Sequence, residues 1–222
     1  MSFDLLAPHY RWMEWLCAGE RLQRCRTALL AALPVPQNVL VYGEGNGRFL
    51  VALCRRFPQA RVTVVEASAA MIKLARTRLR REGLEHAGVA FIHADALRWE
   101  PPAAVFDLIV TCFFLDCFRA DQLQQLMPGI GNAATPDAQW MLADFQIADA
   151  GFRRVRSRMI VGLLYAFFRL TTRIAARELA AVAPGLHTAG FTLVERREFD
   201  SGLLYCDWWS RREIASQARH IN

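Results

Sequence analysis

A short apolar segment that runs directly into three closely spaced glycines constrains this chain more than any other feature. Residues 39–42 (Val-Leu-Val-Tyr) suit a buried strand, and the turn 43–47 (Gly-Glu-Gly-Asn-Gly) follows at once. Glycine carries no Cβ, so such a turn lets the backbone approach a bound molecule closely. A helix expected over residues 49–57 would direct free N–H groups and the positive end of its dipole toward that molecule. The turn is therefore predicted to bind a ligand.

Short apolar strands alternate with helical patterns through the middle of the chain. Near-continuous apolar strands separated by helices are typical of a parallel sheet covered on both faces, which predicts an α/β fold. Further strands are expected over 61–65, 89–93, 105–111 and 139–145, and helices over 69–81 and 120–133.

The flanking regions are expected to complete one domain over residues 1–222. Apolar residues recur at helical spacing from about 10 to 33, and long helical patterns cover 151–177 and 178–189. Two strands, 191–198 and 203–209, surround Asp200-Ser-Gly, a turn suited to a hairpin.

Charge and cysteine usage exclude several classes of function. A net charge of +6 is too small to indicate nucleic-acid binding by itself. The six cysteines form no C-x-x-C pair and no Cys/His spacing typical of a metal site. The N-terminus shows no signal-peptide pattern, so a reduced cytoplasmic location is expected.

Polar residues follow the ends of consecutive predicted strands. Ligands of an open parallel sheet bind beyond the carboxyl ends of its strands, so these residues are expected to face one site. Glu66 follows the second strand, although it could instead cap the next helix, for which Ser68 is the better candidate. Asp95 follows the third strand, where an ordinary turn role stays open, and Asp116 after the fourth strand suits a turn or cap better than catalysis.

This ordered series, from about Val39 to Asp116, resembles motifs I to IV of the class I S-adenosylmethionine-dependent methyltransferases. Dinucleotide-binding folds favour G-x-G-x-x-G, whereas the third glycine here comes one residue earlier. The resemblance implies a Rossmann-like, doubly wound, mostly parallel seven-stranded sheet, with an antiparallel terminal hairpin and a helical insertion after the fifth strand. It also implies four parts: an N-terminal helical lid (1–35), a cofactor-binding core (36–145), an acceptor cap (146–189) and the terminal hairpin (190–222).

The resemblance further implies S-adenosylmethionine as the cofactor. In that family the glycine turn contacts the methionine part, the acid after strand 2 holds the ribose and the acid after strand 3 reads the adenine. The cofactor-binding residues implied in this way are Tyr10, Gly43, Glu44, Gly45, Gly47, Glu66, Ala67, Met71, Asp95, Ala96 and Thr111. The acceptor-binding residues implied are Phe113, Phe114 and Tyr165. No catalytic residue and no metal ligand is predicted.

Two departures from the family pattern bear on function. Val41 stands where the family usually has an acid, and we hypothesise that Glu44 partly replaces that acid. The segment after strand 4, Thr111-Cys-Phe-Phe, has neither the Asn/Asp-Pro-Pro-aromatic motif of enzymes that methylate nucleobase amino groups nor a Pro-Cys nucleophile. A small-molecule acceptor is therefore expected rather than a nucleic acid.

Residues 159–168 are apolar around the whole circumference of the predicted helix, between Arg158 and Arg169. Ten residues are too few to cross a bilayer, which needs about 20. Such a helix must be covered by its own domain, by an apolar acceptor whose pocket it roofs, or by a membrane surface that residues 153–169 contact. The family places its acceptor site near this insertion, which implies a hydrophobic acceptor.

The predicted function is thus methyl transfer from S-adenosylmethionine to a small, apolar acceptor. Three alternatives stay open. One is a dinucleotide-dependent oxidoreductase. Another is a noncatalytic methyltransferase-like binding module, which the valine at position 41 favours. The weakest is an RNA methyltransferase, which only the arginine content supports.

Overall fold

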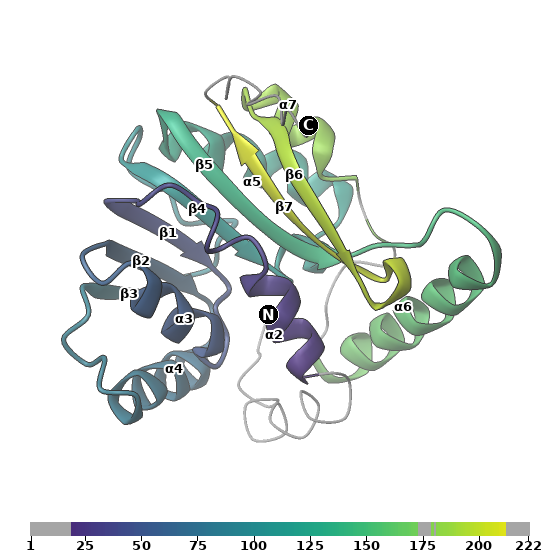
Figure 1. The fold of residues 1–222 in the computed structure, drawn as a ribbon, viewed down its shortest axis with the longest axis horizontal. Helices are drawn as coiled ribbons and strands as arrows, with labels where there is room; N and C mark the ends of the chain where they lie inside the picture. The colour runs from purple at the N-terminus through teal and green to yellow at the C-terminus, as the bar shows by residue number, and fades with distance from the viewer. Residues whose placement is uncertain (1–18, 173–178, 180, 212–222) are drawn as a thin grey trace, which may run out of the picture.

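Seven strands form one sheet in the order β3-β2-β1-β4-β5-β7-β6 (Figure 1). The computed structural model describes residues 19–172, 179 and 181–211. Six strands run in the same direction, and β7 lies antiparallel between β5 and β6. This order and the antiparallel hairpin confirm the predicted fold class. The strands are β1 (Asn38–Tyr42), β2 (Arg61–Glu66), β3 (Val89–His93), β4 (Phe106–Cys112), β5 (Ala134–Phe145), β6 (Thr192–Phe199) and β7 (Leu204–Ser210).

Helices cover both faces of this sheet. Residues of β1 alternate between the two apolar layers, since Val39 and Val41 pack on one face and Leu40 and Tyr42 on the other. The first layer joins the sheet to α2, α3 and α4, and the second joins it to α5 and α7. The helices are α2 (Gly19–Thr27), α3 (Arg48–Arg56), α4 (Ala69–Arg81), α5 (Ala120–Ala133), α6 (Gly151–Thr172) and α7 (Ala183–Thr188).

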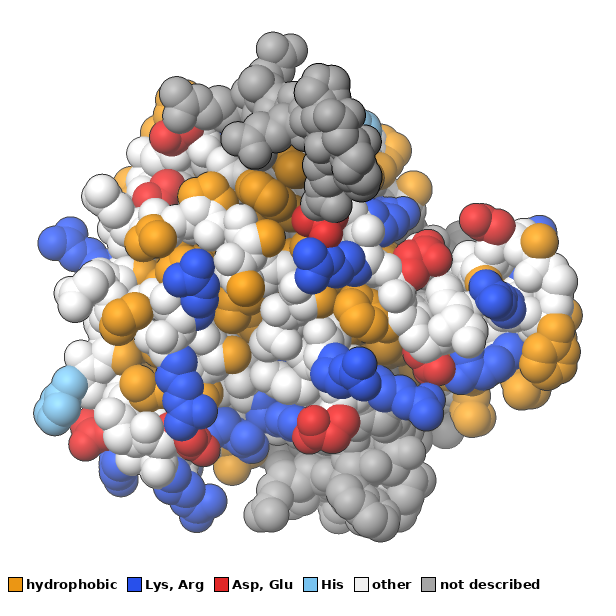
Figure 2. Space-filling view, viewed as in Figure 1, with side chains coloured by type: hydrophobic (Ala, Val, Ile, Leu, Met, Phe, Trp, Pro, Cys, Tyr) orange, Lys and Arg blue, Asp and Glu red, His pale blue; other side chains and the backbone are white. Residues whose placement is uncertain are grey.

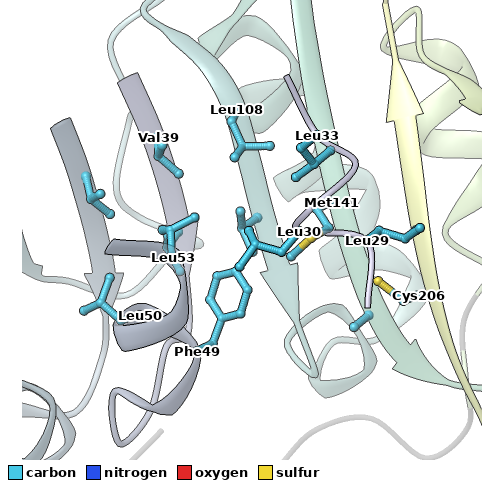
Figure 3. Packing of buried hydrophobic residues seen from close by; sticks show 14 of the residues in the cluster. Leu29, Leu30, Leu33, Val39, Phe49, Leu50, Leu53, Leu108, Met141 and Cys206 are labelled. Carbon is cyan, nitrogen blue, oxygen red and sulfur yellow. The ribbon is translucent and has the colours of Figure 1, made fainter. Parts of the chain in front are cut away.

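The segment after α2 seals one face of the sheet. Leu29 is fully buried, and Leu30 and Leu33 are nearly so. Figure 3 shows these leucines over the sheet beside Leu108 and Met141. Burial of this kind stabilises by about 1.5–3 kcal/mol per large apolar side chain, so the segment after α2 is held firmly against the core.

Strand order reverses at the boundary between β1 and β4. β1 pairs with β2 on one side and with β4 on the other, both in parallel. A crevice-type ligand site in a doubly wound sheet lies at such a reversal, beyond the carboxyl ends of the strands. The glycine turn that follows β1 stands at this point.

Some element boundaries differ from those expected. β5 begins at Ala134, five residues before the expected start at 139, and its pairing with β4 shifts register between Phe106 and Leu108. Residues 135–137 (Thr-Pro-Asp) include a proline and an aspartate, which disfavour a strand, and this hid the extension. The helix expected over 10–33 ends at Thr27 within the described part, and single turns carry the chain on to Ala32.

In the region after β5, α6 follows the expected helix as far as the structure describes it, whereas α7 is shorter than expected. α6 covers Gly151–Thr172 of the expected 151–177, and residues 173–177 lie outside the described part. α7 starts at Ala183 rather than 178, with a proline in its first turn, a position that favours helix initiation. The hairpin is confirmed, with a turn in which Asp200 and Ser201 both take positive φ.

Candidate active site

The glycine turn requires glycine at each of its three positions. Gly43, Gly45 and Gly47 have φ values of +63°, +68° and +85°, in the left-handed region that side chains disfavour. A Cβ on Gly43 would lie 2.5 Å from Cδ2 of Phe114, and one on Gly47 would lie 2.8 Å from Cα of Ala75. Neighbouring residues therefore pack closely against the turn, and its three glycines offer backbone without a Cβ at the reversal of strand order.

Glu66 joins this turn to the end of β2. Its Oε2 accepts a hydrogen bond from the Gly45 amide at 3.1 Å, and its Oε1 accepts from the Ser68 amide at 3.0 Å. The side chain is 8% exposed, and burial raises the pKa of its carboxyl. The structure thus brings together the first two loops that were expected to share a site.

Ser68, rather than Glu66, caps helix α4. Its Oγ accepts a hydrogen bond from the Met71 amide at 3.2 Å, the arrangement of an N-cap residue. Glu66 therefore does not cap α4, and its contact with a ligand stays a prediction. Met71 itself is buried on the first turn of α4.

Glu44 connects the glycine turn to the first turn of α3. Its Oε1 accepts a hydrogen bond from the Leu50 amide at 2.9 Å, in the first turn of α3. The side chain is 7% exposed, and burial raises the pKa of its carboxyl to about 7. In this position Glu44 satisfies the open N-terminus of α3. Direct contact with a cofactor stays a prediction.

Asp95 and Ala96 lie in the loop after β3. Oδ1 of Asp95 accepts a hydrogen bond from the Leu97 amide at 3.1 Å, so this exposed side chain shapes its own turn. Ala96 is buried beneath it. The loop lies next to the end of β2, because His93 Nε2 is 3.0 Å from the Ala67 carbonyl oxygen.

Thr111 lies inside the core rather than at the rim. Its side chain is fully buried, and its Oγ1 accepts a hydrogen bond from Trp140 Nε1 at 2.9 Å. Its hydroxyl therefore joins β4 to β5. Both faces of β4 are apolar and covered, so the sequence did not indicate which way this side chain points.

Aromatic side chains line the loop after β4. Phe114 lies over Gly43, stacks on Tyr42 with ring centroids 5.4 Å apart and meets Phe118 edge-on at 5.0 Å. Phe113 has a positive φ of 52°, packs against Phe145 at 5.1 Å and lies 5.3 Å from the guanidinium carbon of Arg26. These aromatic rings give this end of the site an apolar surface.

Two acids lie together beside this loop: Asp116, which the sequence pointed to as a turn or cap residue, and Asp144, which it did not indicate. Asp144, at the end of β5, is 1% exposed, and its Oδ2 accepts a hydrogen bond from the Asp116 amide at 3.2 Å. Burial raises the pKa of both carboxyls, that of Asp116 to about 6. Such groups are able to accept a proton near neutral pH. The reasoning from strand ends that singled out Glu66 also applies to Asp144.

Arg26 on α2 is a buried cation, 5% exposed, that is not among the site residues expected from the sequence. Its charge lowers the pKa of the Glu44 carboxyl against the larger effect of burial, so α2 and the glycine turn interact.

Two expected site residues lie outside what the structure describes. Tyr10 belongs to residues 1–18, and only the backbone of Tyr165 is described, within α6. Among the described residues, no group of three His, Cys, Asp or Glu side chains is placed to hold a metal ion. No helix in this same part is both long and apolar enough to cross a bilayer.

Comparison with known proteins agrees with this geometry. Residues 39–137, which include the glycine turn and the loops after β2, β3 and β4, match the family described as a methyltransferase domain. Residues of this chain are 43% identical over 84 positions to a trans-aconitate 2-methyltransferase of Rhodopseudomonas palustris, covering 36% of this chain and 30% of that protein. They are 32% identical over 113 positions to a demethylmenaquinone methyltransferase of Thermus thermophilus, covering 50% of each. The chain thus spans half or less of the length of these two relatives.

Solved structures share the fold over nearly the whole chain. A mitomycin 7-O-methyltransferase superimposes with a TM-score of 0.70 at 20% identity, covering 96% of this chain and 61% of that one. A 1,6-didemethyltoxoflavin N1-methyltransferase of Burkholderia thailandensis, solved with S-adenosylhomocysteine bound, gives a TM-score of 0.64 at 19% identity, covering 94% and 85%.

Proposed function

We propose that this chain, a member of the class I S-adenosylmethionine-dependent methyltransferase family, transfers a methyl group from S-adenosylmethionine to a small apolar acceptor. The observation that carries the proposal is the hydrogen bond from the Gly45 amide to Glu66 Oε2, which holds the bare glycine turn beside a buried acid. Such a pair supplies a close backbone approach and a hydroxyl acceptor in one place.

The residues present fit this cofactor. Gly43, Gly45 and Gly47 leave three positions of the turn without a side chain. Their positive φ values make any other residue costly at these positions. A carboxylate offers about four acceptor positions, so Glu66 can accept from a ribose hydroxyl while it holds the Gly45 and Ser68 amides. The exposed Asp95 would then accept a hydrogen bond from the adenine amine.

When bound, S-adenosylmethionine supplies a methyl group already activated by its sulfonium. The chain's own residues would position an acceptor and exclude water. The rings of Phe113 and Phe114 offer an apolar wall beside the turn. An oxygen or nitrogen acceptor must also lose a proton, and the half-buried carboxyl of Asp116 is a nearby group able to take one.

An apolar acceptor is supported by this aromatic wall, and one matched relative is named for demethylmenaquinone. Another is named for trans-aconitate, a carboxylate, and the buried Arg26 guanidinium beside Phe113 is the observation that favours an acceptor of that charge. A reduced quinone and a tricarboxylate therefore form the natural pair of test acceptors. The cytoplasmic location expected from the sequence stays a prediction.

Calorimetric titration tests the cofactor, and label transfer tests the reaction. We expect binding of S-adenosylmethionine and S-adenosylhomocysteine, with no binding of NADH or NADPH. Methyl-labelled S-adenosylmethionine should then transfer label to the reduced quinone in preference to trans-aconitate. Binding of the nicotinamide cofactor alone would favour an oxidoreductase. Cofactor binding without transfer to either acceptor or to any cell-extract component would favour a noncatalytic module.

A further inference from the structure

We propose that the outward face of helix α6 binds the surface of a membrane that contains anionic lipids. This face is defined by Phe152, Val155, Met159 and Leu163. The inference goes beyond methyl transfer and does not depend on it, because none of these residues touches the glycine turn or the loops beside it.

The four side chains are exposed to a degree that is unusual for large apolar residues. Phe152 is 82% exposed, Val155 66%, Met159 69% and Leu163 72%. Their spacings of three, four and four residues place them on one side of the helix. Scattered apolar residues are common on protein surfaces, whereas a continuous row along one helix face marks an interaction site.

The opposite side of α6 fixes the orientation of the helix. Ser157 is 1% exposed and its Oγ accepts a hydrogen bond from the Ala148 amide at 3.1 Å, while Val161 is buried one turn further on. Arg156 Nη2 donates to Asp200 Oδ1 at 3.0 Å, which ties α6 to the turn between β6 and β7. Because these contacts hold one side of α6 against the domain, the outward face points away from it.

The charged residues within α6 are all arginines, and Asp149 is an exposed acid just before the helix begins. Arg153, Arg154 and Arg158 are exposed around it, and residues 151–172 include no Asp or Glu. Figure 2 shows hydrophobic side chains projecting from the right-hand edge of the molecule, where Figure 1 places α6, with blue basic side chains next to them. An apolar row on a helix whose charged residues are all arginines is the pattern of a helix that lies in a membrane interface, where basic side chains are attracted to anionic lipid headgroups.

The charge pattern favours a membrane over a second copy of the chain. Two copies meeting through this face would bring two rows of arginines together without an acid on either helix. Four side chains also fall well short of the roughly 800 Å² per partner that a stable protein interface buries. An anionic bilayer satisfies both the apolar row and the arginines.

Co-sedimentation with lipid vesicles tests the proposal. The protein should pellet with vesicles of phosphatidylcholine and phosphatidylglycerol, pellet far less with phosphatidylcholine alone, and be released by high salt. The variant Met159→Glu/Leu163→Glu should lose at least about tenfold in vesicle affinity, since two apolar side chains that enter the acyl region are replaced by carboxylates that anionic lipids repel.

A matched control is available in Val35, which lies on another surface and has the same 72% exposure as Leu163. Val35→Glu should leave vesicle binding unchanged, and both variants should keep the thermal stability and S-adenosylhomocysteine affinity of the wild type. Equal pelleting of the wild type and the double variant would overturn the proposal. So would a concentration-dependent dimer, seen by sedimentation without lipid, that only the double variant abolishes.

Discussion

The Gly45 amide donates a hydrogen bond to Oε2 of Glu66 at 3.1 Å, across 21 residues of sequence. This contact joins the turn after β1 to the end of β2, where two parallel strands finish at the same edge of the sheet. It places a bare backbone and a carboxylate side by side at the reversal of strand order.

Replacing Glu66 by alanine should weaken S-adenosylhomocysteine binding by about 1–3 kcal/mol, because a carboxylate acceptor is lost and the Gly45 amide loses its partner. Calorimetric titration measures the change. Glu82→Ala is the matched control, since Glu82 pairs with Arg55 on an exposed surface away from the turn. Unchanged affinity in a folded Glu66 variant would place the ribose elsewhere.

Replacing Gly43 by alanine should destabilise the protein by about 3 kcal/mol and abolish cofactor binding. Part of the effect is the positive φ, which costs about 1–2 kcal/mol, and the rest is the overlap of the new Cβ with Phe114. Gly83 separates these effects, because it also has a positive φ of 70° but a Cβ at that position would meet no atom within 4 Å. Denaturant unfolding should show a smaller loss for Gly83→Ala, and equal losses would contradict the close packing at Gly43.

Replacing Glu44 by glutamine should change how stability depends on pH. Burial raises the pKa of the Glu44 carboxyl from 4.5 to about 7, so between these values the unfolded chain releases a proton that the folded chain keeps. The carboxyl therefore costs stability as pH rises from about 4.5 to 7, by about 3 kcal/mol in total, and adds no further change above that range.

The test for Glu44 compares urea unfolding of the wild type and Glu44→Gln from pH 4.5 to 8. Glutamine keeps an oxygen acceptor for the Leu50 amide but does not ionise. The stability of the wild type relative to the variant should fall across this range. A constant difference would mean that Glu44 ionises in the folded protein as it does in the unfolded chain.

Replacing Thr111 by valine should cost about 1–3 kcal/mol of stability, because Trp140 Nε1 is then left buried without its acceptor. Thermal or denaturant unfolding measures this loss. Affinity for S-adenosylhomocysteine should stay as in the wild type if Thr111 only joins β4 to β5. A loss of affinity at full folding would instead support the expectation from the sequence that Thr111 contacts the cofactor.

Local patterns in the chain were enough to predict most of the elements, and also that the glycine turn lies beside the end of the second strand. Apolar runs located the strands, glycine spacing located the turn, and Ser68 before residues 69–81 located a helix start that the structure bears out. These signals work because backbone sterics, capping and burial act between residues that are close in sequence. Only the tertiary structure decided the rest. Thr111 lies in the core, and Glu44 accepts a hydrogen bond from the start of α3. Asp144 lies beside Asp116, and one side of α6 is exposed to solvent. Each of these depends on which distant segment packs against the residue, and a strand or helix with apolar residues on every side carries no local sign of that choice.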